Sequence, residues 1–250
     1  MLKISVITAV YNGRDTVADS LDSTLSQSYP QVEIVLVDGG STDGTLELLE
    51  GYRSRVATFV SERDQGIYDA LNKGIRLSTG DVIGFLHADD VFASRDALAS
   101  IAAAFEDPSV EAVYGDLVYV RRDRLGSIVR EWRAGPYTRA HLQKGWMPPH
   151  PTFYVRRSVY ERLGNFDLAY RIAADYDLMV RFLFVAAIKA AYVPQTLIRM
   201  RVGGVSNRSL RSVINKTKED YRIVLQHGVG GAMTVLQKNL GKVSQFWRRT

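Results

Sequence analysis

The sequence predicts an α/β fold with a mixed, mostly parallel sheet flanked by helices. Through about the first 100 residues, short apolar runs rich in β-branched residues alternate with stretches whose apolar residues recur at helical spacing. The chain has 250 residues and no cysteine, so a hydrophobic core has to stabilise it without disulfides. Because strands that alternate with helices form βαβ units, ligands are expected beyond the carboxyl ends of the strands.

Four strands are expected in this first part, at KISVITAV, VEIVLVDGG, ATFVSERD and DVIGFLHADD, and the first two are of the buried type. A helix is expected after the first strand, because Val17, Leu21 and Leu25 recur four residues apart and share one helical face. TDGTLELLEGY is expected to form a second helix, and another begins at about Ile67. A helix rich in Ala and Leu then runs to about Phe105.

The second part of the chain differs, because antiparallel strands are expected between Val110 and Trp132. There EAVYGDLVYV and GSIVREWRAG flank a charged turn. A Pro-rich loop, KGWMPPHPTFYVRR, leads into a further strand, and a helix is expected from about Asp175. The segment AAYVPQTLIRMRVGG suggests a final pair of strands.

The net charge of +5 is unevenly distributed. Residues 207–250 carry nine Lys and Arg against two acidic residues, so the rest of the chain is mildly acidic. A basic surface over the domain, as nucleic-acid binding requires, is therefore not expected. The basic segment also carries Leu225, Leu236, Phe246 and Trp247, and two interpretations remain open. It lies on an anionic membrane surface, or it packs on the domain or on a second subunit of a homo-oligomer.

The expected location of the protein depends on two features that the sequence lacks. No stretch approaches the roughly 18 apolar residues that cross a bilayer, and MLKISVITAV offers no signal-peptide cleavage site. We expect a cytoplasmic protein whose basic segment is a candidate peripheral contact with the inner face of the cell membrane.

Carboxylates follow three of the predicted strands, at Asp38, at Glu62 and Asp64, and at Asp89 and Asp90. The carboxyl ends of parallel strands meet at one edge of a sheet, where these acids would repel a phosphate unless a cation intervened. Hard cations such as Mg²⁺ prefer oxygen ligands, so a metal-bridged diphosphate is expected there. Neither a G-x-x-x-x-G-K-[ST] loop nor a G-x-G-x-x-G turn follows the first strand, which argues against a P-loop or a dinucleotide site.

The ordered motifs SVITAVYNG, VEIVLVDGGSTDGT, SERDQGIYDALNKGI and GDVIGFLHADD resemble glycosyltransferase family 2, the inverting enzymes with a GT-A fold. The resemblance covers about residues 3–205 and is nearest to bacterial exopolysaccharide transferases of the colanic-acid type. It implies a GT-A domain over 1–205, with a nucleotide-binding half over 1–100 and an acceptor half over 101–205. A basic C-terminal helical segment over 206–250 follows this domain.

The resemblance also implies an activity. A sugar would pass, with inversion, from a nucleotide-diphosphate sugar, with a UDP-sugar favoured, to a hydroxyl of a lipid-linked or polysaccharide acceptor. Mg²⁺ or Mn²⁺ would serve as the cofactor. Two rivals stay open beside it: a sugar-phosphate nucleotidyltransferase, which would normally show a Gly-rich basic loop near the first strand, and a non-catalytic binding or scaffold protein that keeps the fold.

Donor-binding residues are implied near the strand ends and on the helix that begins at about Ile67. They are Thr8, Val10, Tyr11, Asp38, Asp64, Lys73 and Asp89. Asp38 would accept a hydrogen bond from the uracil ring, since an imide N–H suits a carboxylate; alternatively it caps the turn before Gly39 and Gly40. Lys73 would contact the donor phosphates, or it lies solvated on its helix.

The resemblance implies that acidic residues hold the metal and act as the general base. Asp90 would ligate the cation, with Asp89 nearer the sugar or ribose, because a cation relieves the repulsion of adjacent carboxylates. Asp175 in RIAADYDLMVRF would take the proton of the acceptor hydroxyl on the face opposite the leaving group. The alternative is that Asp175 caps its helix, with Asp177 in the first turn.

Two further residues are implied as weaker acceptor or sugar contacts. His150 in MPPHPTFYVRR would lie near one of the sugars, or it is a structural histidine. Arg201 stands where many relatives carry a late His. Arginine cannot ligate a metal, so that contact would be lost or replaced by a cation–phosphate bond.

Overall fold

The computed structural model describes residues 1–203 and 210–244. Its strands are β1 (Ile4–Val10), β2 (Val32–Asp38), β3 (Thr58–Ser61), β4 (Val82–Phe85), β5 (Val91–Phe92), β6 (Ala112–Arg121), β7 (Arg124–Trp132), β8 (Tyr154–Arg156) and β9 (Ala190–Arg201). Its helices are α1 (Val17–Leu25), α2 (Thr45–Glu50), α3 (Ile67–Leu77), α4 (Ala97–Ala104), α5 (Arg139–Gln143), α6 (Arg157–Leu163), α7 (Ala174–Met179), α8 (Leu210–Gln226) and α9 (Ala232–Ser244). Three short helices, η1 (Arg53–Arg55), η2 (His150–Thr152) and the π-helix η3 (Val180–Val185), complete the described part.

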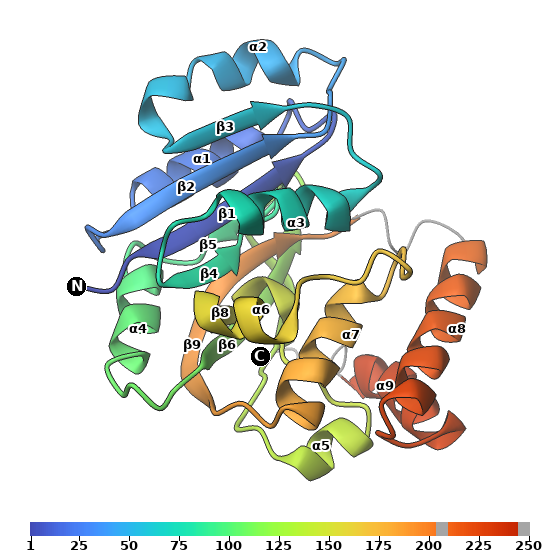
Figure 1. Cartoon of the computed structure of the whole chain (residues 1–250). Helices are drawn as coiled ribbons and strands as arrows, with labels where there is room; N and C mark the ends of the chain where they lie inside the picture. Colours follow the sequence, from blue (N-terminus) through green and yellow to red (C-terminus); the bar gives the residue numbers. More distant parts are fainter. Residues whose placement is uncertain (204–209, 245–250) are drawn as a thin grey trace.

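The strands of the described residues join in one sheet, in the order β3-β2-β1-β4-β8-β6-β9-β5, with β7 paired to β6 (Figure 1). β1 pairs in parallel with β2 and β4, and β2 pairs in parallel with β3. Helices lie between these strands in the sequence and cover the sheet. The predicted mixed, mostly parallel sheet flanked by helices is therefore confirmed.

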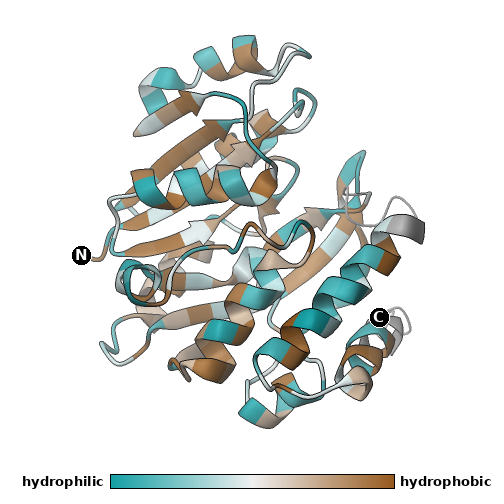
Figure 2. Cartoon of the chain, turned by 45° about the vertical axis from the view of Figure 1, so that its right-hand side comes forward, coloured by the Kyte–Doolittle hydropathy of each residue, from teal (hydrophilic) through white to brown (hydrophobic). Residues whose placement is uncertain are grey.

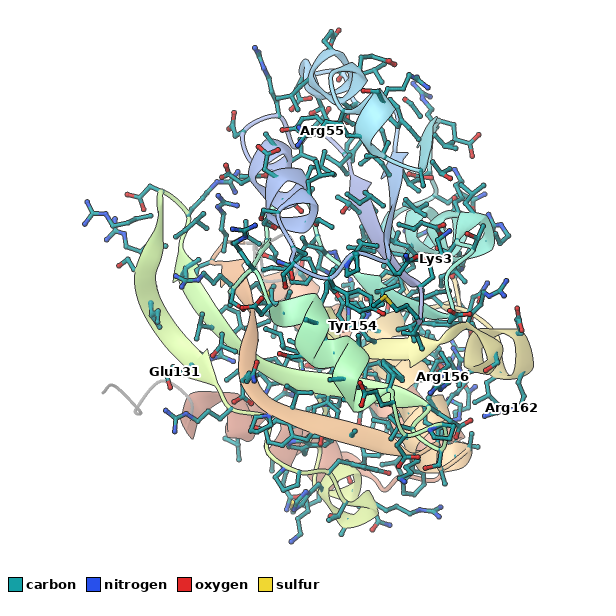
Figure 3. All side chains as sticks on the ribbon, turned by 90° about the vertical axis from the view of Figure 1, so that its left-hand side faces the viewer. Lys3, Arg55, Glu131, Tyr154, Arg156 and Arg162 are labelled. Carbon is teal, nitrogen blue, oxygen red and sulfur yellow. The ribbon has the colours of Figure 1, made fainter. Side chains whose placement is uncertain are left out.

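The second part of the sheet is mixed. β8 is antiparallel to both β4 and β6, and the predicted antiparallel pair of β6 and β7 is present. This pair extends away from the rest of the sheet and carries Glu131 (Figure 3). The prediction of a final pair of strands is wrong, because β9 is one strand of 12 residues. Its pairing jumps from Val193 to Thr196, so Pro194 sits in a bulge, where its missing N–H costs no ladder bond.

Alternation along the buried strands divides the core between the faces of the sheet. In β1, Ile7 packs in one cluster with Phe85, whereas Ile4 packs on the opposite face with Leu98 of α4. Close packing also fixes Gly84 in β4, because a Cβ atom there would lie 2.0 Å from the ring of Tyr154. Tyr154 is fully buried within the body (Figure 3).

The C-terminal helices pack on the domain. Ile223 and Val224 of α8 and Val235 of α9 are buried in the same core cluster as Phe182. α8 stands beside α7 (Figure 1). The predicted C-terminal helices are thus present, and their described part shares the main core. Phe246 and Trp247, part of the predicted membrane contact, lie outside the described residues. Among the described helices, none combines the length and the apolar character that crossing a bilayer requires.

Candidate donor and catalytic site

The first strand ends at an exposed aromatic ring. Tyr11 follows β1 and is 66% exposed. Beside it lies Gly39, where a Cβ atom would be 2.8 Å from Oδ2 of Asp64 and 3.5 Å from the Tyr11 ring. The absence of a side chain at Gly39 therefore lets an aromatic ring and a carboxylate lie next to each other. Such a pair suits a flat heterocycle with N–H donors.

Two other predicted donor residues lie behind this surface. Thr8 and Val10 are both buried in β1, and the hydroxyl of Thr8 has no hydrogen-bond partner within the described residues. Thr8 and Val10 thus lie inside the sheet, whereas Tyr11 is exposed at the end of β1, and their contact with a donor stays a prediction.

Asp38 is fully buried at the end of β2 and bonds to its own surroundings. Its carboxylate accepts hydrogen bonds from the backbone N–H of Gly40 (3.1 Å) and Ser41 (3.1 Å) and from the hydroxyls of Ser41 (2.5 Å) and Ser61 (2.6 Å). The turn-capping alternative therefore describes this conformation. Its contact with a base stays a prediction that requires the loop of Ser41 to open.

Lys73 of α3 is held by acids. Its ammonium lies 2.5 Å from Asp64 and 2.8 Å from Glu62, and it donates to the backbone oxygen of Arg63. Only 13% of its side chain is exposed, so it is not the freely solvated lysine of the alternative. Burial raises the pKa of Asp64, and the nearby ammonium opposes this shift. A contact from Lys73 to phosphate stays a prediction, because the ammonium would first have to leave these acids.

The turn after β4 carries the predicted metal site. Asp89 is half-buried, and Asp90 is fully buried. One oxygen of Asp90 accepts the N–H of Arg201 (3.1 Å), and the other, Oδ2, has no hydrogen-bond partner within the described residues. Burial raises the pKa of Asp90 well above its ordinary value, and the charge of Asp89 adds to the shift.

Arg201 bonds within the protein, and its expected contact with a sugar stays a prediction. Its buried guanidinium donates to the backbone oxygens of Asp89 (2.8 Å) and Arg122 (3.2 Å) and pairs with the carboxylate of Asp19. Arg201 therefore fastens the Asp89–Asp90 turn to α1 and to the turn between β6 and β7. It also lines a cleft of about 720 Å³ that Asp15 of the loop before α1 borders.

The donor set at this turn fits a hard divalent cation. Within the described residues no group of three His or acidic side chains is arranged to hold a metal. Mg²⁺ needs fewer protein ligands, because it is usually bound through one or two carboxylates together with substrate phosphates and water. The carboxylate of Asp89 and the unpartnered Oδ2 of Asp90 match that requirement.

Asp175 lies at the start of α7, half-buried, and accepts a hydrogen bond from the hydroxyl of Tyr68 (3.1 Å). Tyr68 also donates to the backbone oxygen of Ile172 (2.8 Å). Burial raises the pKa of Tyr68 well above its ordinary value, and the charge of Asp175 reinforces the shift. Tyr68 thus remains a neutral donor to one oxygen of Asp175, and the role of Asp175 as a base stays a prediction.

Two histidines lie beside these acids. Their ring centroids are 5.9 Å apart, and His150 also stacks on Phe85 at 5.5 Å. Burial lowers the pKa of His150 to about 4 and also lowers that of His87; the charge of Asp175 opposes both shifts, and that of Asp89 opposes the one on His87. Ring contacts continue from His150 to Phe166 (5.7 Å) and from Phe166 to Tyr68 (5.4 Å), so a row of side chains connects His87 in the turn after β4 with the partner of Asp175 at the start of α7. His150 is a buried, neutral side chain whose Nε2 has no hydrogen-bond partner within the described residues, and its contact with a sugar stays a prediction.

Asp177 is bonded within the fold and shares no contact with Asp175 among those described for the site. It is buried and bonds to Arg181 (2.8 Å) and to Nε2 of His227 (2.7 Å) at the end of α8. Sequence reasoning missed Glu219 of α8, which accepts hydrogen bonds from the backbone just before Asp175. No local pattern signals it, since its partners lie more than 40 positions away in the chain.

Comparisons with known proteins agree with this arrangement. The family model described as glycosyl transferase family 2 matches residues 5–164. A PGL/p-HBAD biosynthesis glycosyltransferase of Mycobacterium bovis is 32% identical over 209 residues, covering 81% of this chain and 78% of the relative. An uncharacterized glycosyltransferase of Mycobacterium tuberculosis is 33% identical over 184 residues, covering 73% and 69%.

Solved structures share the fold at low identity. The crystal structure of S. aureus TarS 1–349 in complex with UDP-GlcNAc superposes with a TM-score of 0.70 at 18% identity, covering 91% of this chain. This chain spans 66% of the length of that TarS chain. The mannosyltransferase PcManGT from Pyrobaculum calidifontis, in complex with GDP-Man and Mn²⁺, gives 0.66 at 20% identity, covering 100% of this chain and 76% of that one.

An α/β sheet with acids gathered beyond its carboxyl edge, in this strand order, defines an enzyme domain of the GT-A class. The matched motifs within this fold specify the family. The chain belongs to glycosyltransferase family 2 and is a glycosyltransferase.

Proposed function

We propose that the protein transfers a sugar, with inversion, from a nucleoside-diphosphate sugar to a hydroxyl of a lipid-linked or polysaccharide acceptor. One observation carries the proposal: Asp175, half-buried and held by Tyr68, is connected to the turn that carries Asp89 through the ring contacts of Tyr68, Phe166, His150 and His87. A single base near the predicted diphosphate site is the arrangement that direct displacement at an anomeric carbon requires.

The donor would bind across the carboxyl edge of the sheet. The exposed ring of Tyr11 and the carboxylate of Asp64 beside Gly39 support a nucleobase there. A UDP-sugar is favoured, because Asp38 and Asp64 would accept an imide N–H once they leave Ser41 and Lys73, and TarS was crystallised with UDP-GlcNAc. PcManGT was crystallised with GDP-Man, so guanine is the competing base.

In the transfer step, Asp175 takes the proton of the acceptor hydroxyl as its oxygen attacks the anomeric carbon, and the bond from that carbon to the diphosphate breaks. Tyr68 holds one oxygen of Asp175, which leaves the other to receive the proton. Asp89 and Asp90 would hold Mg²⁺ or Mn²⁺, which when bound supplies positive charge to neutralise the departing diphosphate. Arg201 keeps those two acids in place through the backbone of their turn.

A thermal-shift panel of UDP, dTDP, GDP and CMP, each with and without Mn²⁺, tests the donor site. One nucleotide at about 100 times its Kd is expected to add about 2.7 kcal/mol of stability, or very roughly 5–10 °C, and only with the metal. UDP should give the largest shift, and Tyr11→Ala should reduce it, because the exposed ring is lost. The surface variant Tyr221→Ala is the matched control. Equal responses to all four nucleotides would contradict a base-specific site.

For the acceptor, we propose that α8 rests on an anionic lipid surface. Its exposed apolar residues fall on one helical face, and Lys218 and Arg222 are exposed on the same helix. Both carboxylates of α8, Glu219 and Asp220, are instead bonded within the protein. The exposed apolar side chains of α8 and α9 include Ile214, Tyr221, Leu225, Met233, Leu236 and Leu240. Figure 2 shows apolar and hydrophilic residues alternating along α8.

Vesicle flotation tests this contact. The protein is expected to float with vesicles that contain anionic lipid and not with neutral ones. The double variant Lys218→Glu/Arg222→Glu should bind at least about tenfold more weakly, since each basic residue near the surface contributes about 1 kcal/mol. Lys189→Glu, on a different surface, is the control. If the wild-type protein does not bind anionic vesicles and sediments as a dimer, the result would favour the interpretation that this segment packs on a second subunit.

A further inference from the structure

We propose that Glu219 of α8 is a positioning residue that sets the start of α7 and thereby aims Asp175. The inference rests on the proposed function in one respect only: the residue being positioned is the general base. It makes α8 part of the catalytic apparatus and not merely a support on the outside of the domain.

The carboxylate of Glu219 accepts hydrogen bonds from three successive backbone N–H groups. Oε1 accepts the N–H of Arg171 (3.1 Å), and Oε2 accepts those of Ile172 (2.9 Å) and Ala173 (2.9 Å). These three donors lie just before the first helical residue of α7, Ala174, at the end of the helix where a negative charge is favourable. The residue at the N-cap position of α7 is Ala173, whose side chain cannot accept a hydrogen bond. Glu219 therefore supplies, from another helix, the acceptors for the backbone that leads into α7.

The segment is also held from its other side. Ile172 donates its N–H to Glu219, and its carbonyl oxygen accepts the hydroxyl of Tyr68 (2.8 Å), whose proton is shared with Asp175 (3.1 Å). Ile172 is thus fixed between α3 and α8, three residues before the base. Without the Glu219 contacts, Tyr68 would be the one hydrogen-bond partner left to Ile172 among the described residues. The Asp175 carboxylate would then no longer be kept in one orientation.

Docking of α8 does not depend on Glu219. Ile223 and Val224 are fully buried, Gln226 accepts the hydroxyl of Tyr170 (2.9 Å), and His227 bonds to Asp177 (2.7 Å). These contacts hold α8 against α7 (Figure 1) even where Glu219 is changed. A variant at Glu219 is therefore expected to keep the fold and to alter the segment before the base.

The test compares Glu219→Ala and Glu219→Gln with Asp220→Asn on the same helix. Asp220 is buried between Lys216 and Lys238, so its loss weakens the contact of α8 with α9 and leaves the backbone of 171–173 bonded. We expect kcat to fall about tenfold in Glu219→Ala and less in Glu219→Gln, which keeps one acceptor. The donor KM should stay within about twofold. Asp220→Asn should lower Tm and leave kcat within about twofold.

Amide hydrogen exchange of residues 171–175, measured without substrates, gives a readout independent of turnover. Exchange should be faster in Glu219→Ala and unchanged in Asp220→Asn. Unchanged exchange, or faster exchange with an unchanged kcat, would overturn the inference. If the wild-type protein transfers no sugar, the proposed function fails, and faster exchange in Glu219→Ala would still support the positioning of Asp175.

Discussion

Asp175→Asn is expected to lower kcat for sugar transfer by about 10²–10⁴-fold, the range that a positioned general base contributes. The amide keeps the size of the carboxylate and can still accept the hydrogen bond from Tyr68, so the start of α7 should be preserved. It cannot take a proton from the acceptor hydroxyl. The donor KM and the nucleotide-induced thermal shift should therefore stay within about twofold of the wild-type values. Initial rates at saturating donor and acceptor measure the effect.

Asp167→Asn is the matched control, because Asp167 is an exposed acid in the loop before α7 that bonds only within its own turn. It should leave kcat nearly unchanged. A wild-type rate in Asp175→Asn, with donor binding intact, would assign the base to another group. No transfer by the wild type, with intact donor binding, would contradict the proposed acceptor classes instead.

Much of the fold could be predicted because its signals are local. The buried runs that became β1, β2 and β4 are short, apolar and β-branched, and the faces of α1 and α3 show helical spacing. β9 could not be predicted as one strand, since Pro194 normally interrupts a strand. Only its pairing with β6, and the bulge that this pairing permits, accommodates the proline.

The site was predictable in position and less so in detail. The acids fall at the strand ends as expected, but their partners depend on distant segments. Asp38 bonds to Ser61, Lys73 bonds to Asp64, and Arg201 reaches Asp19, which is 182 positions away. Motif reasoning treats each of these side chains as free for a ligand. The structure shows that the protein itself occupies them, so a donor would have to displace some of these bonds.

The opposite case is Asp90, which has an oxygen without a partner among residues 1–203 and 210–244. At neutral pH a buried carboxyl with a raised pKa costs stability, because the folded state holds a proton that the unfolded state has lost or else carries a buried charge; each unit of the pKa shift is worth about 1.4 kcal/mol. Asp90→Asn keeps an oxygen to accept the N–H of Arg201 and removes the ionisable group. We therefore expect the metal-free variant to melt about 2–6 °C above the wild type. The same change should abolish the Mn²⁺-dependent shift with nucleotide and lower transfer at least about 100-fold.

The gain in stability should also depend on pH, with a sign fixed by the raised pKa of Asp90. In the unfolded chain a carboxyl ionises near pH 4, whereas folded Asp90 keeps its proton to higher pH. Above about pH 4 the unfolded state therefore binds fewer protons, and the stability of the wild type falls as pH rises. The gain from Asp90→Asn should be larger at pH 7.5 than at pH 4.5.

Urea unfolding of both proteins at the two pH values, in EDTA, measures this difference, and Asp81→Asn at the opposite end of β4 serves as the control. An Asp90→Asn variant that is less stable than the wild type without metal would mean that the buried carboxylate is satisfied by the fold itself. Asp90 would then be a structural residue, and Asp89 would be the remaining acid of this turn to hold the cation. A variant that is more stable and has lost its metal response would mean that the fold tolerates an unfavourable charge at the position where the donor diphosphate needs a cation.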